Sequence, residues 1–168
     1  MPARRPVSML AVLILPMLSP VPRATDPLDR LVASTSGTWN CSSVSNGKTT
    51  TYVTTWSRVT GTRWLRGVNR SGTSQSIDME TYDTKHNLWR VVDMEPDGTM
   101  SVLTGTASDP DHITTQSHYP DSTQTVHYDR LAPNRYTLTF DFILAGKPAH
   151  WVDDCLRQEH RSTRRTPP

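Results

Sequence analysis

Short runs of β-branched and aromatic residues dominate the chain between residues 35 and 156, and no stretch there has the period of an amphipathic helix. The runs recur about every dozen residues and are divided by residues that favour turns. The turn sequences are Ser45-Asn46-Gly47, Thr60-Gly61, Ser71-Gly72, Lys85-His86-Asn87, Pro96-Asp97-Gly98, Asp109-Pro110-Asp111, Pro120-Asp121, Pro133-Asn134 and Gly146-Lys147-Pro148. Turns this frequent predict about ten strands. Connections this short join antiparallel neighbours, because a parallel crossover needs a dozen residues or more.

Hydrophobic and polar side chains alternate along several of these runs, which places them on opposite faces of a sheet. The clearest case is YTLTFDFIL, whose apolar face carries Tyr136, Leu138, Phe140, Phe142 and Leu144. In SIDMETYD, Ile77 and Met79 alternate with Asp78 and Glu80. Because an apolar face belongs in a covered interior, we expect Ile77 and Met79 to point inward.

A sheet of this kind, with no helix to cover its apolar face, would expose two long edges unless it closed on itself. We therefore predict an all-β fold, a single antiparallel up-and-down β-barrel of about ten strands over residues 37–158. Such a barrel has room for its own side chains and for one small ligand. Many of the strand positions are Thr and Ser, so the interior is expected to be partly polar.

A short helix is predicted in the lead-in segment, residues 25–36. Asp26 is a suitable N-cap residue and Pro27 a suitable first helical residue. The apolar side chains of this segment, Leu28, Leu31 and Val32, are expected to cover one mouth of the barrel.

The two ends of the chain have the composition of processing and tail segments. Residues 1–24 have an early basic pair and then an apolar core too short for a permanent membrane span, the pattern of a secretory signal peptide; an uncleaved anchor is the alternative. We expect no stable membrane span after cleavage, and a secreted or periplasmic protein. Residues 159–168 predict a disordered basic tail. Removing the three arginines of residues 1–24 changes the formal charge from +2 to −1, which argues against a nucleic-acid partner.

Two cysteines lie on the first and last predicted strands, which are neighbours in a closed barrel. Cys41 and Cys155 are therefore expected to form a disulfide in an exported protein; two buried free thiols and a metal pair are the alternatives. Trp39 precedes the first cysteine by two residues and Arg157 follows the second by two. The same register would place the guanidinium of Arg157 on the indole of Trp39 as a structural pair.

These residues also resemble a known superfamily. Gly37-Thr38-Trp39 on the first strand, with Arg157 on the last, is similar to the Gly-x-Trp…Arg signature of the calycins, which include the lipocalins. The fuller pattern is SGTWNC, TTWSRVTGTRWLRG, YDTKHNLW, DMEPDGTMSVLTG and YTLTFDF…AGK. It resembles bacterial lipocalin-like domains of unknown function, of the DUF1579 kind, over about Leu31 to Arg157. The resemblance implies a barrel that binds a ligand, and it supplies no catalytic residues.

No catalytic, metal or cofactor motif is apparent. The opening strand lacks the extra glycines of haem-binding barrels, and no Gly-x-Ser-x-Gly nucleophile motif occurs. His112 and His118 share a strand but are separated by about 20 Å, too far for one metal ion. His127 and His150, like His118, are interpreted as solvated strand residues.

Aromatic residues and one acid are the candidates for ligand binding. They are Trp56, Trp64, Tyr82, Trp89, Tyr136, Phe140, Trp151 and Asp153, and a place in the barrel core is the favoured interpretation of each aromatic residue taken singly. Asp153 and Asp154 should point to opposite sides of the sheet, and an inward Asp153 would need an Arg or Tyr partner. A structural acid held by such a partner is the favoured interpretation of Asp153, and ligand recognition is the alternative.

The favoured hypothesis is an exported barrel that binds or carries a small, partly apolar and unidentified molecule. Two alternatives stay open: a small-barrel isomerase or hydrolase that uses an inward His/Asp pair, and a structural or interaction module of the cell envelope.

Overall fold

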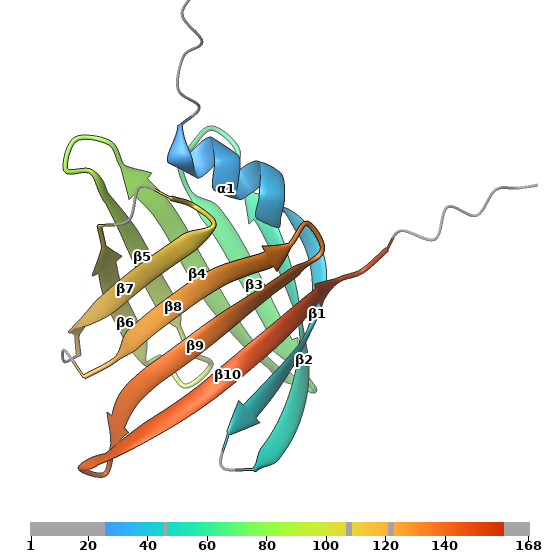
Figure 1. Ribbon diagram of the computed structural model, residues 1–168, viewed down its shortest axis with the longest axis vertical. Helices are drawn as coiled ribbons and strands as arrows, with labels where there is room; N and C mark the ends of the chain where they lie inside the picture. The colour runs from blue at the N-terminus through green and yellow to red at the C-terminus, as the bar shows by residue number, and fades with distance from the viewer. Residues whose placement is uncertain (1–25, 46, 107–108, 121–122, 160–168) are drawn as a thin grey trace, which may run out of the picture.

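The chain forms one closed antiparallel β-barrel with a short helix at one mouth (Figure 1). The computed structural model describes residues 26–159, apart from 46, 107–108 and 121–122. The elements are α1 (Pro27–Thr35), β1 (Gly37–Ser45), β2 (Lys48–Arg58), β3 (Leu65–Ser71), β4 (Ser74–Asp83), β5 (Leu88–Met94), β6 (Met100–Gly105), β7 (His112–Tyr119), β8 (Thr125–Ala132), β9 (Arg135–Leu144) and β10 (Lys147–Arg157). Each strand pairs with its neighbours in the sequence, and β1 pairs with β10. The predicted fold class is confirmed.

The seam between β1 and β10 has the predicted register. Cys41 is paired with Cys155, and their sulfur atoms form a disulfide across 114 residues of sequence. Two positions along the same strands, Trp39 is paired with Arg157. The guanidinium carbon of Arg157 lies 4.5 Å from the centroid of the indole ring. Both cross-strand contacts expected at this seam are therefore confirmed.

Hydrogen bonds connect this seam to the end of α1. Arg157 Nη1 donates to the carbonyl of Ser36 at 2.9 Å, and Nη2 donates to the carbonyl of Ser34. Trp39 Nε1 donates to the carbonyl of Thr35 at 2.8 Å. The last turn of α1 leaves carbonyl groups without helical partners, and these side chains supply the missing donors. The position of the helix thus depends on the strand pair that closes the barrel.

Helix α1 covers one mouth of the barrel, as the lead-in segment predicts (Figure 1). Asp26 Oδ1 accepts a hydrogen bond from the Leu28 amide at 2.9 Å, and Pro27 opens the helix. Leu28 and Leu31 are fully buried, where they pack on the apolar end of the barrel interior. The core at this end consists of Leu28, Leu31, Trp39, Cys41, Trp56, Leu65, Tyr82, Trp89, Ile113, Tyr136 and Cys155.

The β9–β10 turn differs in position from the prediction. Ala145 and Gly146 alone connect the strands, with φ angles of 50° and 76°. A two-residue hairpin of this kind needs positive φ at both positions, and glycine meets that need without a steric penalty. Lys147 and Pro148, expected in the turn, instead begin β10.

The predicted signal peptide, residues 1–24, lies outside the described residues, and so do residues 160–168 of the predicted tail. Within the described part of the chain, no helix has the length and apolar character required to cross a membrane.

Loss of the disulfide should destabilise the barrel without changing its fold. We expect the double variant Cys41→Ala/Cys155→Ala to lose about 2–5 kcal/mol of unfolding free energy, because the long closed loop restricts the unfolded chain. Urea titration monitored by tryptophan fluorescence measures the loss. Reducing agent should lower the stability of the wild type alone, and an unchanged midpoint in the variant would contradict the expectation.

Arg157 should contribute far more to stability than an exposed arginine at the same end. Replacing Arg157 with Leu removes the indole contact and the donors to two carbonyls, so we expect a loss of about 2–4 kcal/mol. Arg135, which forms an exposed ion pair with Asp154 at 2.8 Å, is the matched control. Arg135→Leu should cost less than about 1 kcal/mol. Equal losses in the two variants would show that the Arg157 contacts are unimportant.

Candidate functional site

The barrel encloses a cavity of about 480 Å³. At one end the cavity reaches Leu31 and Thr35 of α1, and at the other it reaches Ser71, Ser74 and Pro96, next to the turns of the opposite mouth. The volume is within the range of small-molecule sites in proteins. The cavity is therefore the candidate ligand-binding site, with α1 as its closed end.

Six aromatic side chains form much of the cavity wall. They are Tyr52, Trp56, Tyr128, Tyr136, Phe140 and Trp151. Trp56 is held flat against β3, because its ring atoms lie 2.8 Å from the position that a Cβ would take on Gly67. Its Nε1 donates to Tyr136 Oη at 3.2 Å. Phe140 and Trp151 contact each other at 5.0 Å between ring centroids, nearer the open mouth.

The aromatic residues proposed from the sequence fall into three groups. Trp56, Tyr136, Phe140 and Trp151 line the cavity. Tyr82 and Trp89 are buried beneath α1, with ring centroids 5.0 Å apart, and are not among the lining residues. Trp64 lies between β2 and β3 and is partly exposed. Asp153 also lines the cavity.

The expected orientation of the run SIDMETYD is wrong. Asp78 and Glu80 line the cavity, whereas Ile77 and Met79 do not. The side-chain period of a strand is two residues, so one anchored residue fixes the orientation of all the others. In β4 that anchor is Tyr82, which is buried in the core and paired with Trp89. Asp78 and Glu80 lie four and two residues before Tyr82, so their carboxyl groups point to the same inner face as its ring.

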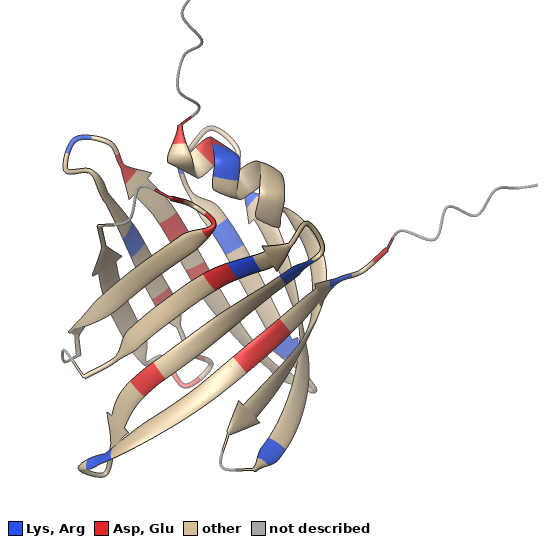
Figure 2. Ribbon diagram, viewed as in Figure 1, with Lys and Arg blue, Asp and Glu red and all other residues tan. Residues whose placement is uncertain are grey.

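Acidic residues of β4 and β5 line the cavity, and Figure 2 marks the acidic positions along the strands in red. The interior carboxyls are Asp78, Glu80, Asp93, Glu95 and Asp153. Asp78 and Asp93 are direct cross-strand partners. Like charges in that position destabilise a sheet. Of these five acids, the sequence pattern identifies only Asp153 as a candidate. The alternation along β4 is visible in the sequence, but it does not show which face of the strand points inward.

Burial raises the pKa of these carboxyl groups. Desolvation, with repulsion from Asp78 and Asp93, raises the pKa of Glu80 to about 8. Desolvation and the neighbouring acids Asp78 and Glu95 raise the pKa of Asp93 to about 8. For Asp78 the same burial raises the pKa to about 6, opposed by the Asn69 amide, which donates to Oδ2 at 2.8 Å. Desolvation and repulsion between the carboxylates both favour the neutral acid in an interior that lacks compensating charge.

Positive side chains do not balance these acids. Among the described residues that line the cavity, Arg70 is the only Lys or Arg, and it is exposed at the mouth. Within the described ranges, no ion pair joins a basic side chain to any interior carboxyl. The cavity therefore has an excess of acidic groups.

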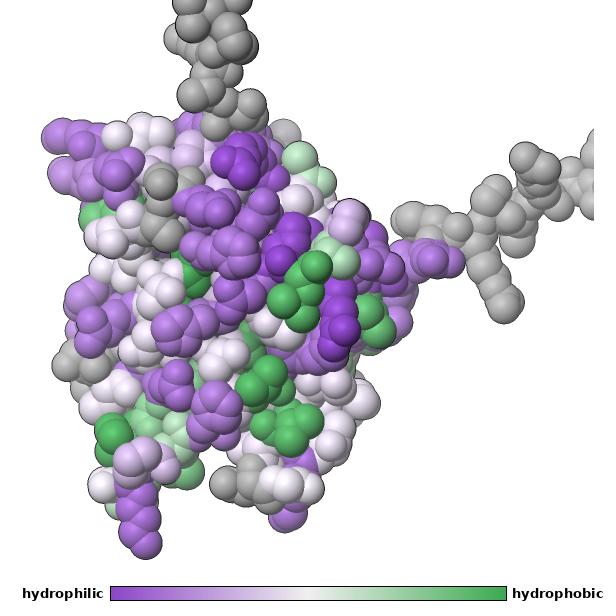
Figure 3. Space-filling model, viewed as in Figure 1, coloured by the Kyte–Doolittle hydropathy of each residue, from purple (hydrophilic) through white to green (hydrophobic). Residues whose placement is uncertain are grey.

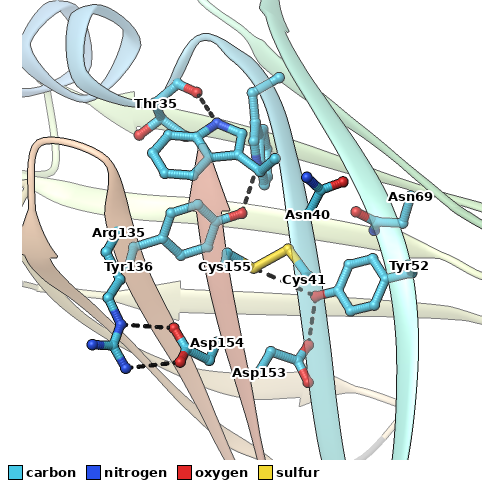
Figure 4. The surroundings of a disulfide bond; sticks show 12 residues. Thr35, Asn40, Cys41, Tyr52, Asn69, Arg135, Tyr136, Asp153, Asp154 and Cys155 are labelled. Atoms are coloured by element: carbon cyan, nitrogen blue, oxygen red, sulfur yellow. Dashed lines mark hydrogen bonds and ion pairs between the residues drawn. A yellow bond between two sulfur atoms is a disulfide. The ribbon is translucent and has the colours of Figure 1, made fainter. Parts of the chain in front are cut away.

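Asp153 has the tyrosine partner that an inward carboxylate requires. Tyr52 Oη donates to Asp153 Oδ2 at 2.6 Å, beside the disulfide (Figure 4). The other oxygen, Oδ1, is buried and has no hydrogen-bond partner among the described residues. Burial raises the pKa of Asp153, and the hydrogen bond from Tyr52 and the nearby hydroxyl of Ser43 oppose that rise; the Ser43 hydroxyl does not form a hydrogen bond with Oδ1. Asp154 points outward and binds Arg135, so the predicted divergence of the two acids is confirmed.

The described histidines do not line the cavity. Each contacts a neighbour in a turn or on the outer surface: His86 with Asp83, His112 with Asp129, His118 with Thr104, His127 with Thr114, and His150 with Asp141. The enzyme alternative required an inward His/Asp pair, and the described part of the chain contains none. Nor does any group of three or more His, Cys, Asp or Glu side chains there converge to hold a metal ion.

The outer surface is mainly hydrophilic on the face shown in Figure 3, where apolar side chains form small, separate groups. This distribution does not favour the interaction-module alternative on that face, because a docking surface is expected to be a contiguous apolar patch.

Comparison with known proteins adds little to this description. No protein-family model matches the chain, and no curated protein matches it. A solved structure of a redesigned β-barrel is similar at 14% identity with a TM-score of 0.35, over 77% of this chain and 96% of that one. The resemblance to lipocalin-like domains therefore stays a prediction.

Stability should fall as pH rises through the neutral range. A carboxyl group whose pKa is raised on folding keeps its proton in the folded state at a pH where the unfolded chain has lost it. Its contribution to the free energy of unfolding is therefore complete below the pKa of the unfolded chain and is lost as the pH rises to the pKa of the folded state. With Glu80 and Asp93 at about 8 and Asp78 at about 6, the thermal midpoint should fall between pH 5 and pH 8.5. Scanning calorimetry across this range measures the slope.

The variant Glu80→Gln should flatten that slope near pH 8, since it removes one of the titrating groups. Asp97→Asn is the matched control, because hydrogen bonds from Thr99 lower the pKa of Asp97 and place its titration below this range. A midpoint that rises toward pH 8, or an equal effect of the two variants, would contradict the assignment.

Proposed function

We propose that this protein is an exported, lipocalin-like barrel that binds a small, partly apolar molecule in its cavity. The observation that carries the proposal is the cavity itself, of about 480 Å³, with an aromatic wall and polar groups distributed within it. A barrel serving only as a scaffold would be expected to fill this space with side chains at the density of an ordinary core.

Polar atoms in the wall would orient the ligand. The hydroxyls of Tyr128 and Tyr136 and the amide of Asn69 lie in the cavity wall together with the carboxyl groups of β4 and β5 and the apolar and aromatic side chains. This combination of apolar area and few directional groups is typical of ligand sites. The closed end beneath α1 would make the opposite mouth the entrance.

Export is supported by the disulfide and by the signal-like composition of residues 1–24. Disulfides persist in secreted and periplasmic proteins and are rare in a reducing cytosol. The bond between Cys41 and Cys155 is part of the strand pair that closes the barrel. An oxidising compartment would therefore stabilise the cavity directly.

Binding of a neutral apolar dye tests the proposal. We expect N-phenyl-1-naphthylamine to bind the mature protein in a 1:1 complex, with increased dye fluorescence and quenched tryptophan emission. Val126 is part of the cavity wall. The variant Val126→Trp, whose larger side chain would occupy part of the cavity, should weaken binding at least about tenfold by steric exclusion. Trp64→Phe, a change outside the lining residues, should leave the affinity unaltered.

Circular dichroism and a thermal midpoint would show that each variant is folded. A folded wild-type protein that binds no dye, or a Val126→Trp variant that binds as well as the wild type, would overturn the proposal.

A further inference from the structure

We propose that the ligand is a small organic cation, an amine or quaternary ammonium ion with an apolar body. This inference rests on the proposed function and specifies the chemical class of the molecule that the cavity takes. It follows from three independent features of the interior: the excess of acidic side chains, an acceptor atom without a partner, and the aromatic wall opposite the acids.

The first feature is the arrangement of acids on adjacent strands. Asp78 and Asp93 face each other across β4 and β5, Glu80 lies two residues further along β4, and Glu95 follows β5. All of them border the same cavity. Placing like charges opposite one another weakens a sheet, and burying them weakens it further. Without a cation the acids avoid this repulsion only by binding protons, which is why the pKa values of Glu80 and Asp93 are raised. A bound cation would instead compensate the ionised carboxylates.

The second feature is Asp153, which lies on β10, one of the two strands that close the barrel. Its side chain is part of the cavity wall although the residue is only 6% exposed. Tyr52 satisfies Oδ2, but Oδ1 has no hydrogen-bond partner among the described residues. Buried acceptors in native proteins are almost always paired. An amine ligand would supply an N–H donor to this oxygen, and a quaternary ammonium ion would compensate it by its charge alone.

The third feature is the aromatic wall, which selects an organic cation over a metal ion. The faces of indole and phenol rings attract cations that have lost part of their hydration, as quaternary ammonium sites demonstrate. Trp56 and Trp151 supply indole rings to the cavity. A hard metal ion would instead need six or more converging oxygen atoms. The described residues offer no such converging group.

The charged and titratable groups that face the acids are consistent with this assignment. Tyr52, Tyr128 and Tyr136 face the cavity from β2, β8 and β9, and burial raises the pKa of each phenol, so all three are neutral. Arg70 borders only the mouth. Uptake of a cation should therefore be balanced by ionisation of the interior carboxyls themselves, with release of protons.

Three probes of similar shape test the inference: benzyltrimethylammonium, its uncharged carbon analogue neopentylbenzene, and the anion phenylacetate. At pH 8.5 and constant ionic strength, calorimetry or tryptophan quenching should show that the cation binds at least tenfold more tightly than the neutral analogue. Phenylacetate should bind more weakly still. The preference for the cation should shrink at pH 5.5. Because the quaternary cation carries no proton, calorimetry in two buffers at pH 7 should reveal release of about one proton.

The double variant Asp78→Asn/Asp93→Asn should lose the preference for the cation while it still binds the neutral probe. Its thermal midpoint should not fall, since it removes opposed charges. Asp154→Asn, on the outer face beside Asp153, is the control and should keep the preference.

Each outcome bears on one of the two proposals. A neutral probe that binds as tightly as the cation, or a preference that survives the double variant, would overturn the cation assignment and leave the cavity as a ligand site. Binding of Ca²⁺ or Mg²⁺ alone would also overturn it. If N-phenyl-1-naphthylamine binds but none of the three probes does, the cation assignment is overturned and the proposed function stands. If neither the dye nor any probe binds the folded protein, both proposals are overturned.

Discussion

The pairing of β1 with β10 is the constraint on which the other features of this molecule depend. Seven residue pairs, from Trp39–Arg157 to Ser45–Trp151, join the two strands. Without them the sheet would have two open edges, α1 would lose the donors that hold its last turn, and the interior would open to solvent. The disulfide and the guanidinium–indole contact both lie in this seam, next to the buried end of the cavity. Covalent closure, helix placement and cavity shape therefore have a common origin.

The interior combines two tendencies that oppose each other in an ordinary protein core. Its closed end, under α1, contains the cluster of buried apolar and aromatic residues. Further along, β4 and β5 bring carboxyl groups into an enclosed space with no basic partner among the described lining residues except Arg70 at the mouth. Residues that lower the stability of the fold without an evident structural benefit often mark functional sites. The acids of β4 and β5 are in this sense the most informative residues of the chain.

Much of the fold could be predicted from the sequence, because turn residues and alternation are local signals. Cys41, Trp39 and their partners could be matched as well, since in a closed meander the first strand pairs with the last strand as well as with the second. The inward direction of Asp78 and Glu80 could not be predicted, because alternation defines two faces without saying which is inside. That choice was made by the contact of Tyr82 with Trp89 beneath the helix. The hydrogen bond between Tyr52 and Asp153 spans 101 residues and left no trace in the local pattern.

Hydrogen exchange of the backbone amides in β1 and β10 tests the closure of the barrel most directly. If the two strands are paired along their length, the amides of residues 39–45 and 151–157 should exchange only by global unfolding, as slowly as those of the central strands. Protection of this kind should appear on both sides of β1, toward β2 and toward β10. Rapid exchange of every second amide in β1 and in β10 would show two free edges, and it would contradict a closed barrel and the enclosed acidic cavity.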